Sequence, residues 1–208
     1  MKEGYSIEVV IPAYNPGSFF RKCMESCFQQ TFKDNYNLTI VDDGSSEDIH
    51  SVISAFQPYP DNIKINYIRI EENRGAAHAR NVGINHTASD LIVFHDADDY
   101  MCSDRLEVTV DAFKKDSNLV MVCGNWRWII NGESEDAPRF SKEHPIEYIT
   151  LLFDLPISSP TVAIKRDILK TTGLFNEKYV VAEDYDLWAR IVKHYPDRVK
   201  YIHKEMIL

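Results

Sequence analysis

Two short apolar runs, each leading into acidic residues, constrain this chain more than any other feature of its sequence. Leu91-Ile92-Val93-Phe94 leads into Asp96-Ala97-Asp98-Asp99, and residues 38–41 lead into Asp42-Asp43. An apolar run this short is typical of a buried strand. Acidic residues at its end reach the sheet edge where open α/β folds bind their ligands. The sequence therefore predicts a ligand site where these two strands end.

The acidic cluster at 96–99 also indicates a metal. Alternate side chains of an extended segment point the same way, so Asp96 and Asp98 are expected to face one side. Two carboxylates that close repel each other unless a cation or a shared proton lies between them. Oxygen-only ligands favour Mg²⁺ or Mn²⁺ over zinc. The alternative is a solvated acidic turn in which Asp104 caps the next helix.

Strand-like and helix-like segments alternate through the first 124 residues. Strands are expected at 9–11 (ended by Pro12), 38–41, 65–70, 91–94 and 119–123. Helices are expected after Pro16, after Gly44, from Gly75 and through 106–113, and Ser45 with Asp48 resembles a capping box before the second of these. Ala76, Ala79 and Gly83 are small enough for close packing on a sheet. This order predicts an α/β fold with a mostly parallel, Rossmann-like sheet flanked by helices.

The pattern becomes irregular after Gly124. Residues 126–130 alternate in the manner of a strand, and Asn131-Gly132 is a strong turn signal, so an antiparallel excursion is expected. A helix at 146–153, a strand at 162–164, a helix at 185–194 and a strand at 201–208 follow. We expect one domain, 1–208, in which residues 1–124 bind a phosphorylated or nucleotide-like ligand and residues 125–208 bind its reaction partner.

Composition limits the classes of partner and compartment. The formal charge of −9 and the lack of a basic stripe argue against nucleic acid. The cysteines Cys23, Cys27, Cys102 and Cys123 include no C-x-x-C pair and are expected to be reduced and mostly buried. No segment resembles a signal peptide or a membrane span. A cytoplasmic protein is expected, with peripheral contact at the inner face of the membrane left open.

Five motifs in one order carry a resemblance to a known family. They are Ile11-Pro12-Ala13-Tyr14-Asn15, Val41-Asp42-Asp43-Gly44-Ser45, Asn73-Arg74-Gly75 with Ala79-Arg80-Asn81-Val82-Gly83, Asp96-Ala97-Asp98-Asp99, and Glu183-Asp184-Tyr185-Asp186. This order resembles the inverting nucleotide-sugar glycosyltransferases of family 2, which have an A-type fold. The resemblance extends from the first strand to Arg190.

The resemblance implies a set of nucleotide-sugar-binding residues. They are Pro12, Ala13, Tyr14, Asn15, Asp43, Arg80, Asp96, Ala97 and Asp98. Asp43 would accept a hydrogen bond from the base, which favours the N3–H of uracil, although thymine and guanine offer donors as well. Arg80 would supply positive charge near the diphosphate. The alternatives are helix capping for one of Asp42 and Asp43, a core position for Tyr14, and plain salt bridges for Arg80 and Arg74.

The resemblance also implies a mechanism. Asp98, with Asp96 or Asp99, would hold Mn²⁺ or Mg²⁺ against the leaving diphosphate. Inversion needs one displacement and a base for the acceptor hydroxyl, and Asp184 matches the family's base. The alternative is that Glu183 and Asp184 only favour a helix N-terminus.

The second half is expected to bind a glycan or a lipid-linked acceptor. Trp126, Trp128 and the loop to Pro145 would form this side, with one tryptophan packed into the core. No Q-x-x-R-W motif of the polymerising members surrounds Arg190, so transfer of single sugars is expected. Family members usually continue beyond the last strand, so the chain is expected to be either truncated or a short member.

Two other classes of protein share part of this pattern. A haloacid-dehalogenase-like phosphatase also places D-x-D after an apolar strand. That strand normally comes first in the domain, with Thr or Val where this chain has Tyr100. The other class is a non-catalytic nucleotide-sugar-binding module of the same fold.

Overall fold

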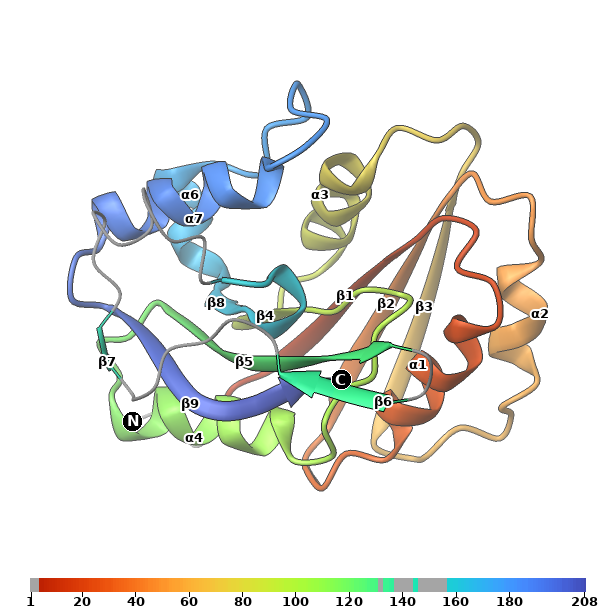
Figure 1. Ribbon diagram of the computed structural model, residues 1–208, viewed down its shortest axis with the longest axis horizontal. Coiled ribbons are helices and arrows are strands. Elements are labelled where there is room, and N and C mark those ends of the chain that lie inside the picture. The colour runs from red at the N-terminus through yellow and green to blue at the C-terminus, as the bar shows by residue number, and fades with distance from the viewer. Residues whose placement is uncertain (1–3, 131–132, 137–143, 146–156) are drawn as a thin grey trace.

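Strand β1 (Ile7–Ala13) lies in the interior of a mixed sheet. Neighbouring strands of this sheet follow one another in the order β3-β2-β1-β4-β8-β5-β9-β7 (Figure 1). The computed structural model describes residues 4–130, 133–136, 144–145 and 157–208. The remaining strands are β2 (Tyr36–Asp43), β3 (Ile63–Ile70), β4 (Leu91–Phe94), β5 (Met121–Ile130), β6 (Glu133–Asp136), β7 (His144–Pro145), β8 (Ala163–Lys165) and β9 (Val199–Ile207). The helices are α1 (Phe19–Phe28), α2 (Ile49–Ser54), α3 (Ala76–His86), α4 (Arg105–Lys115), α6 (Leu169–Thr172) and α7 (Glu183–His194), with short 3-10 helices η1 (Ser159–Thr161) and η2 (Arg166–Ile168).

The first four strands form the parallel part of the sheet. β1 pairs in parallel with β2 and with β4, and β2 pairs in parallel with β3. Val9, Val10 and Ile11 are completely buried because helices cover both faces of β1. The prediction of a mostly parallel sheet flanked by helices is confirmed.

The second half extends the same sheet. β8 is antiparallel to both β4 and β5, while β9 is parallel to β5. The expected antiparallel excursion is the β5–β6 pair. The expected last strand is β9, and it does return to the sheet. The predicted turn at 131–132 and helix at 146–153 lie outside the described residues.

Three expectations about local structure are wrong. Pro12 does not end the first strand, since it lies within β1 opposite Val41. Residues 121–123 and 126–130 are not separate strands but parts of β5, which begins two residues later than expected and shifts register on either side of Asn125. Asp48, not Ser45, is the N-cap of α2, because its carboxylate accepts a hydrogen bond from the Ser51 amide at 3.0 Å.

The helices divide between the two faces of the sheet. Buried side chains of α1, α2 and α4 pack with Val9 and Ile11 in one cluster. Side chains of α3, α6 and α7 pack with Val10 and Phe94 in another. Figure 1 shows α3, α6 and α7 together above the sheet. Successive residues of one strand therefore contribute to separate cores.

Helix α3 lies unusually close to β1. A β-carbon added at Gly83 would come within 2.5 Å of Val10 Cγ1. The expectation that small residues let this helix approach the sheet is confirmed at this position. The close approach fixes the helix that carries Arg80, one turn earlier.

We predict that Gly83→Ala lowers the free energy of unfolding by about 1–3 kcal/mol, because the new methyl group overpacks the contact with Val10. Helix propensity alone predicts the opposite, a gain of about 1 kcal/mol. Urea denaturation measures the difference. Gly4→Ala is the control, since no atom lies within 4 Å of its added β-carbon. A stabilised Gly83→Ala variant would contradict the packing argument.

Candidate functional site

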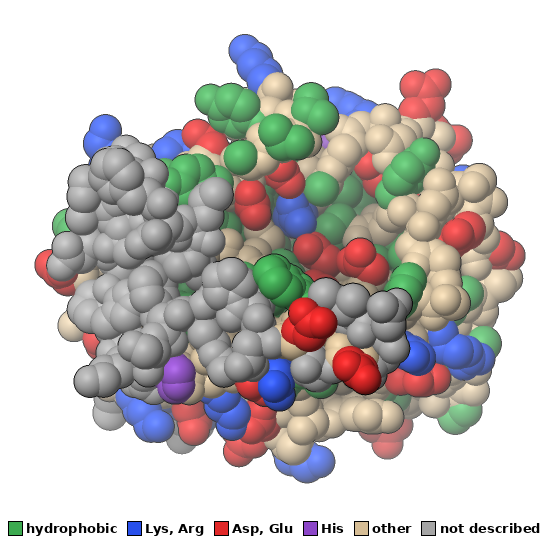
Figure 2. Space-filling view, viewed as in Figure 1, with side chains coloured by type: hydrophobic (Ala, Val, Ile, Leu, Met, Phe, Trp, Pro, Cys, Tyr) green, Lys and Arg blue, Asp and Glu red, His purple; other side chains and the backbone are tan. Residues whose placement is uncertain are grey.

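The carboxyl ends of β1, β2 and β4 open onto a cavity of about 600 Å³. These strands run in the same direction, and the chain order reverses between β1 and β4, which is where open α/β sheets bind ligands. Figure 2 shows a hollow in this face of the molecule, with acidic side chains around a basic one. A volume of this size suits a small organic ligand.

All nine residues predicted to bind the nucleotide sugar line this cavity. They are Pro12, Ala13, Tyr14, Asn15, Asp43, Arg80, Asp96, Ala97 and Asp98. The sequence reasoning missed six further lining residues, Pro16, Phe19, Asn73, Gly75, Ala76 and Ala79. Among these six, Phe19 of α1 is 54% exposed and offers an aromatic side chain to the cavity. Tyr14 is equally exposed, so a core position for Tyr14 is excluded.

Arg80 joins the two halves of the chain at the cavity. Its guanidinium donates to Asp96 Oδ1 and to Glu183 Oε1, each at 2.9 Å. The side chain is only 7% exposed. Burial opposes the charge, but Asp96, Glu183 and Asp184 outweigh it and raise the pKa of Arg80. Arg80 is therefore both a wall of the cavity and an ion-paired side chain.

The acidic cluster after β4 turns instead of staying extended. The Asp99 amide donates to the Asp96 carbonyl at 3.2 Å, so the expected alternation along an extended segment is wrong. Asp96 and Asp98 still reach the cavity together, whereas Asp99 does not line it. Burial and the charge of Asp96 raise the pKa of Asp99 to about 7. The Asp99 carboxylate thus lies on the inner side of the turn.

Asp98 is the carboxylate best placed for a divalent ion. It is exposed, and none of the described groups donates a hydrogen bond to its carboxylate. The carboxylates of Asp96, Asp98 and Asp99 do not converge within 4.8 Å as a set of three in the described part of the chain. Mg²⁺ and similar ions commonly take one or two carboxylates and complete their shell with phosphate oxygens and water. Asp98 with Asp96 fits that pattern.

Asp42 and Asp43 have separate roles at the end of β2. Buried Asp42 accepts from the Ser45 amide at 2.8 Å, from Tyr67 at 2.6 Å and from Arg69 at 2.5 Å. Asp42 therefore holds the turn at Gly44 and caps no helix, because the N-cap of α2 is Asp48, so the helix-capping alternative is wrong for Asp42. Asp43 instead accepts from the amides of Arg74 and Gly75 just before α3 and lines the cavity.

Asp184 lies in the first turn of α7, beside the Arg80 pair. Its Oδ2 accepts from the Ser159 hydroxyl at 2.5 Å, and its Oδ1 accepts from the Tyr185 amide at 2.7 Å. The side chain is half-buried, and it does not line the 600 Å³ cavity itself. Ser159 comes from η1 and was not predicted, because nothing in the sequence links it to a residue 25 positions later.

The tryptophans of β5 differ as expected. Trp126 is half-buried and packs against the core, whereas Trp128 is 47% exposed.

The salt bridge considered as an alternative role for Arg74 is present. It joins Arg74 to Glu177 at 3.5 Å, and both side chains are exposed. The loop expected to run to Pro145 lies largely outside the described residues.

Comparisons with known proteins identify relatives along most of the chain. The family model described as Glycosyl transferase family 2 matches residues 8–173. A protein of Haemophilus influenzae described as a glycosyltransferase is 29% identical over 95% of this chain and 76% of its own length. UDP-Glc:alpha-D-GlcNAc-diphosphoundecaprenol beta-1,3-glucosyltransferase WfgD of Escherichia coli is 29% identical over 92% of this chain and 71% of its own length.

Solved structures share the fold at lower identity. S. aureus TarS 1-349 superposes with a TM-score of 0.78 at 20% identity, over 97% of this chain and 59% of TarS 1-349. The mannosyltransferase PcManGT from Pyrobaculum calidifontis, solved with GDP-Man and Mn²⁺, has a TM-score of 0.72 at 18% identity, over 97% of this chain and 57% of its own. This chain therefore spans less than two thirds of these two structures.

We predict that Arg80→Gln lowers the free energy of unfolding by about 3 kcal/mol at pH 7, because it leaves Asp96 and Glu183 without a counter-charge. Urea denaturation of both proteins at pH 7 tests it. Arg74→Gln, which breaks an exposed pair, should change stability by less than about 0.5 kcal/mol. Equal effects of the two substitutions would contradict the assignment.

Proposed function

The chain belongs to glycosyl transferase family 2 and is a glycosyltransferase, and from this premise we propose that it transfers single sugars from a nucleotide-sugar donor with inversion. The acceptor would be a hydroxyl of a glycan or a lipid-linked sugar in bacterial polysaccharide synthesis. One observation carries the proposal: nine residues from four separate motifs line one cavity at the carboxyl ends of parallel strands. The phosphatase alternative is set aside by the family membership.

The donor is proposed to be a UDP-sugar. Two backbone amides hold the buried Asp43 carboxylate in place on the cavity wall, so it can accept from a base N–H with little reorganisation. Exposed Tyr14 and Phe19 offer aromatic faces at the same cavity. WfgD is named for UDP-Glc, and TarS 1-349 was solved with UDP, whereas PcManGT was solved with GDP-Man. These relatives make UDP the first choice and GDP the second.

Asp98, together with Asp96, is proposed to hold Mn²⁺ or Mg²⁺. When bound, such an ion stabilises the negative charge that develops on the leaving diphosphate. The ion pair with Arg80 fixes the orientation of Asp96 and offsets part of the negative charge of the turn. Asp98, whose carboxylate no described group holds, is left to act as the principal ligand.

Asp184 is proposed as the base that takes the proton of the acceptor hydroxyl. The Ser159 hydroxyl and the Tyr185 amide each occupy one of its oxygens and fix the plane of the carboxylate. Inversion by one displacement requires no protein nucleophile, and the base must lie on the acceptor side of the sugar. The Glu183–Arg80 pair holds the start of α7 against the donor cavity, which supports the assignment of Asp184 as the base.

The acceptor side is proposed to include apolar surface around the start of α7. Val180 and Val181 are 94% and 77% exposed in the loop before this helix, and half-exposed Tyr179 adjoins them. Figure 2 shows apolar side chains gathered at the top of this face, over that loop. An apolar rim next to the base suits the lipid part of a lipid-linked acceptor or a membrane surface.

None of the described helices has the length and apolar character needed to cross a membrane. Action at the cytoplasmic face of the membrane, through peripheral contact, is part of the proposal.

We predict that Asp98→Asn abolishes metal-dependent binding of UDP while the protein stays folded. Calorimetric titration of UDP with and without Mn²⁺, alongside circular dichroism, tests this. Asp111→Asn, which removes an exposed charge from α4, is the matched control and should bind like the wild type. Unchanged Mn²⁺-dependent affinity in Asp98→Asn would overturn the metal assignment.

We predict that Asp184→Asn retains UDP and Mn²⁺ binding but lowers kcat about 10²- to 10⁴-fold, as loss of a general base does. Ser159→Ala should lower kcat less, with the KM for the donor unchanged, because Ser159 only positions the base. Turnover of radiolabelled UDP-sugars with lipid-linked acceptors measures both.

Glu183→Gln is the control, because it removes the neighbouring acidic side chain and leaves Asp184 in place. It should mainly lower the free energy of unfolding, since Glu183 pairs with Arg80. A loss below tenfold for Asp184→Asn would remove it as the base. A wild-type protein that binds donor but turns over none would favour the non-catalytic module.

A further inference from the structure

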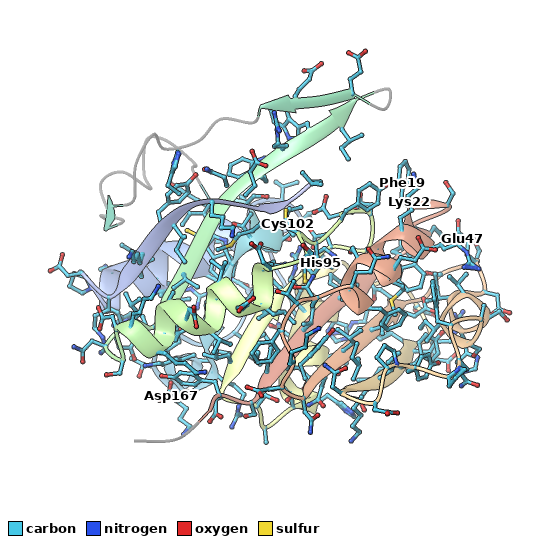
Figure 3. The ribbon with its side chains drawn as sticks, turned by 90° about the horizontal axis from the view of Figure 1, so that it is seen from below. Phe19, Lys22, Glu47, His95, Cys102 and Asp167 are labelled. Carbon is cyan, nitrogen blue, oxygen red and sulfur yellow. The ribbon has the colours of Figure 1, made fainter. Side chains whose placement is uncertain are left out.

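A second group of metal-ligating side chains is buried next to the acidic turn. Cys23 and Cys27 lie one turn apart on α1, and His95 immediately precedes Asp96. Each of the three is fully buried, and one ligand atom from each lies within 4.8 Å of the other two. Figure 3 shows His95 in the interior, between α1 and α4.

His95 has no ordinary structural explanation. Both of its ring nitrogens are buried without a hydrogen-bond partner among the described residues. A buried polar group left in this state costs about 1–3 kcal/mol, so native proteins rarely keep one without a function. An apolar residue at this position would join the buried cluster that contains Cys23 and Cys27 at no such cost.

The cysteines provide the complementary chemistry. All four cysteines of the chain are free thiols, as expected, and only Cys102 is not fully buried. The contact between the two thiols lowers the pKa of Cys27 and raises the pKa of Cys23, and the nearby His95 and Arg105 also lower the pKa of Cys27 against burial. Two cysteine sulfurs and an imidazole are a soft donor set, unlike the oxygen-only set at the cavity.

We propose that Cys23, Cys27 and His95 form a structural Zn²⁺ site. Zinc takes thiolate at about 2.3 Å and imidazole at about 2.0 Å in a tetrahedron, which needs donor atoms a little under 4 Å apart. The observed group needs only a small contraction to reach this spacing. Two thiolates, a neutral imidazole and Zn²⁺ sum to zero charge, so the filled site suits a dry interior. A water molecule would take the fourth position of the tetrahedron, because no carboxylate of the described residues lies within 4.8 Å of all three side chains.

The proposed site adjoins the backbone of the acidic turn after β4 and would help to fix that turn. Cys23 Sγ lies 3.6 Å from the Asp96 carbonyl oxygen, and the His95 amide donates to the Val10 carbonyl of β1. A zinc ion would therefore tie α1 to the end of β4, where the backbone turns to present Asp96 and Asp98. Its role is to fix that turn, separately from any ion bound at the cavity.

The first test is the metal content of the wild-type protein, purified without metal-affinity resin. Plasma mass spectrometry should find one zinc ion per chain, retained after dialysis against EDTA that strips the cavity. Cys27→Ser and His95→Leu should lose it, whereas Cys123→Ser, a buried cysteine in β5, should keep it. Wild-type protein that holds no zinc, and takes none up on refolding with Zn²⁺, overturns the proposal even if the variants fail to fold.

The second test is the sign of the stability change in His95→Leu. Loss of a zinc ligand should lower the Tm by several degrees relative to the zinc-loaded wild type. If His95 is only a core residue, leucine removes two unsatisfied nitrogens and the Tm should rise. A titration that finds fewer than four thiols in the denatured wild type would show a Cys23–Cys27 disulfide and also overturn the proposal.

Discussion

The ion-paired guanidinium of Arg80 is the interaction on which the arrangement of the site depends. It lies between Asp96, just after a central strand, and Glu183, at the start of α7. Glu183 is 103 residues further along the chain than Arg80. A buried charge of this kind is stable only when its partners are fixed in place. The requirement works in both directions, because the two carboxylates are also held by the cation. The donor cavity and the start of α7 are thereby kept in one geometry.

Much of the cavity could be predicted because a parallel sheet places distant motifs together. Once residues 9–11, 38–41 and 91–94 are recognised as neighbouring parallel strands, their carboxyl ends must share an edge. Asp43 and Asp98 therefore line the same cavity, although 55 positions separate them in sequence. The resemblance to a family added the identity of Tyr14, Asn15 and Arg80, which periodicity alone does not single out.

The features that sequence reasoning missed depend on contacts without a local signature. Ser159 reaches Asp184 from a 3-10 helix, and Glu183 meets Arg80 from the other half of the chain. The predicted capping box does not form, because the Ser45 hydroxyl accepts a hydrogen bond from the Asn15 amide instead. The sequence gives no sign that Asn15 lies near Ser45. The turn after β4 could not be predicted, because acidic residues give no signal for the direction of the backbone. At Ser45 a tertiary hydrogen bond overrode a plausible local pattern.

The end of β4 separates two kinds of chemistry by the alternation of adjacent side chains. His95 points into the core formed with α1, while Asp96 points to Arg80 and the cavity. Carboxylates and phosphate oxygens are suited to a hydrated ion that is exchanged with each substrate. Thiols and an imidazole buried away from water are suited to an ion that stays with the fold. Because the two sets share one strand end, a fixed inner site would hold the backbone of the outer one without competing for the same metal.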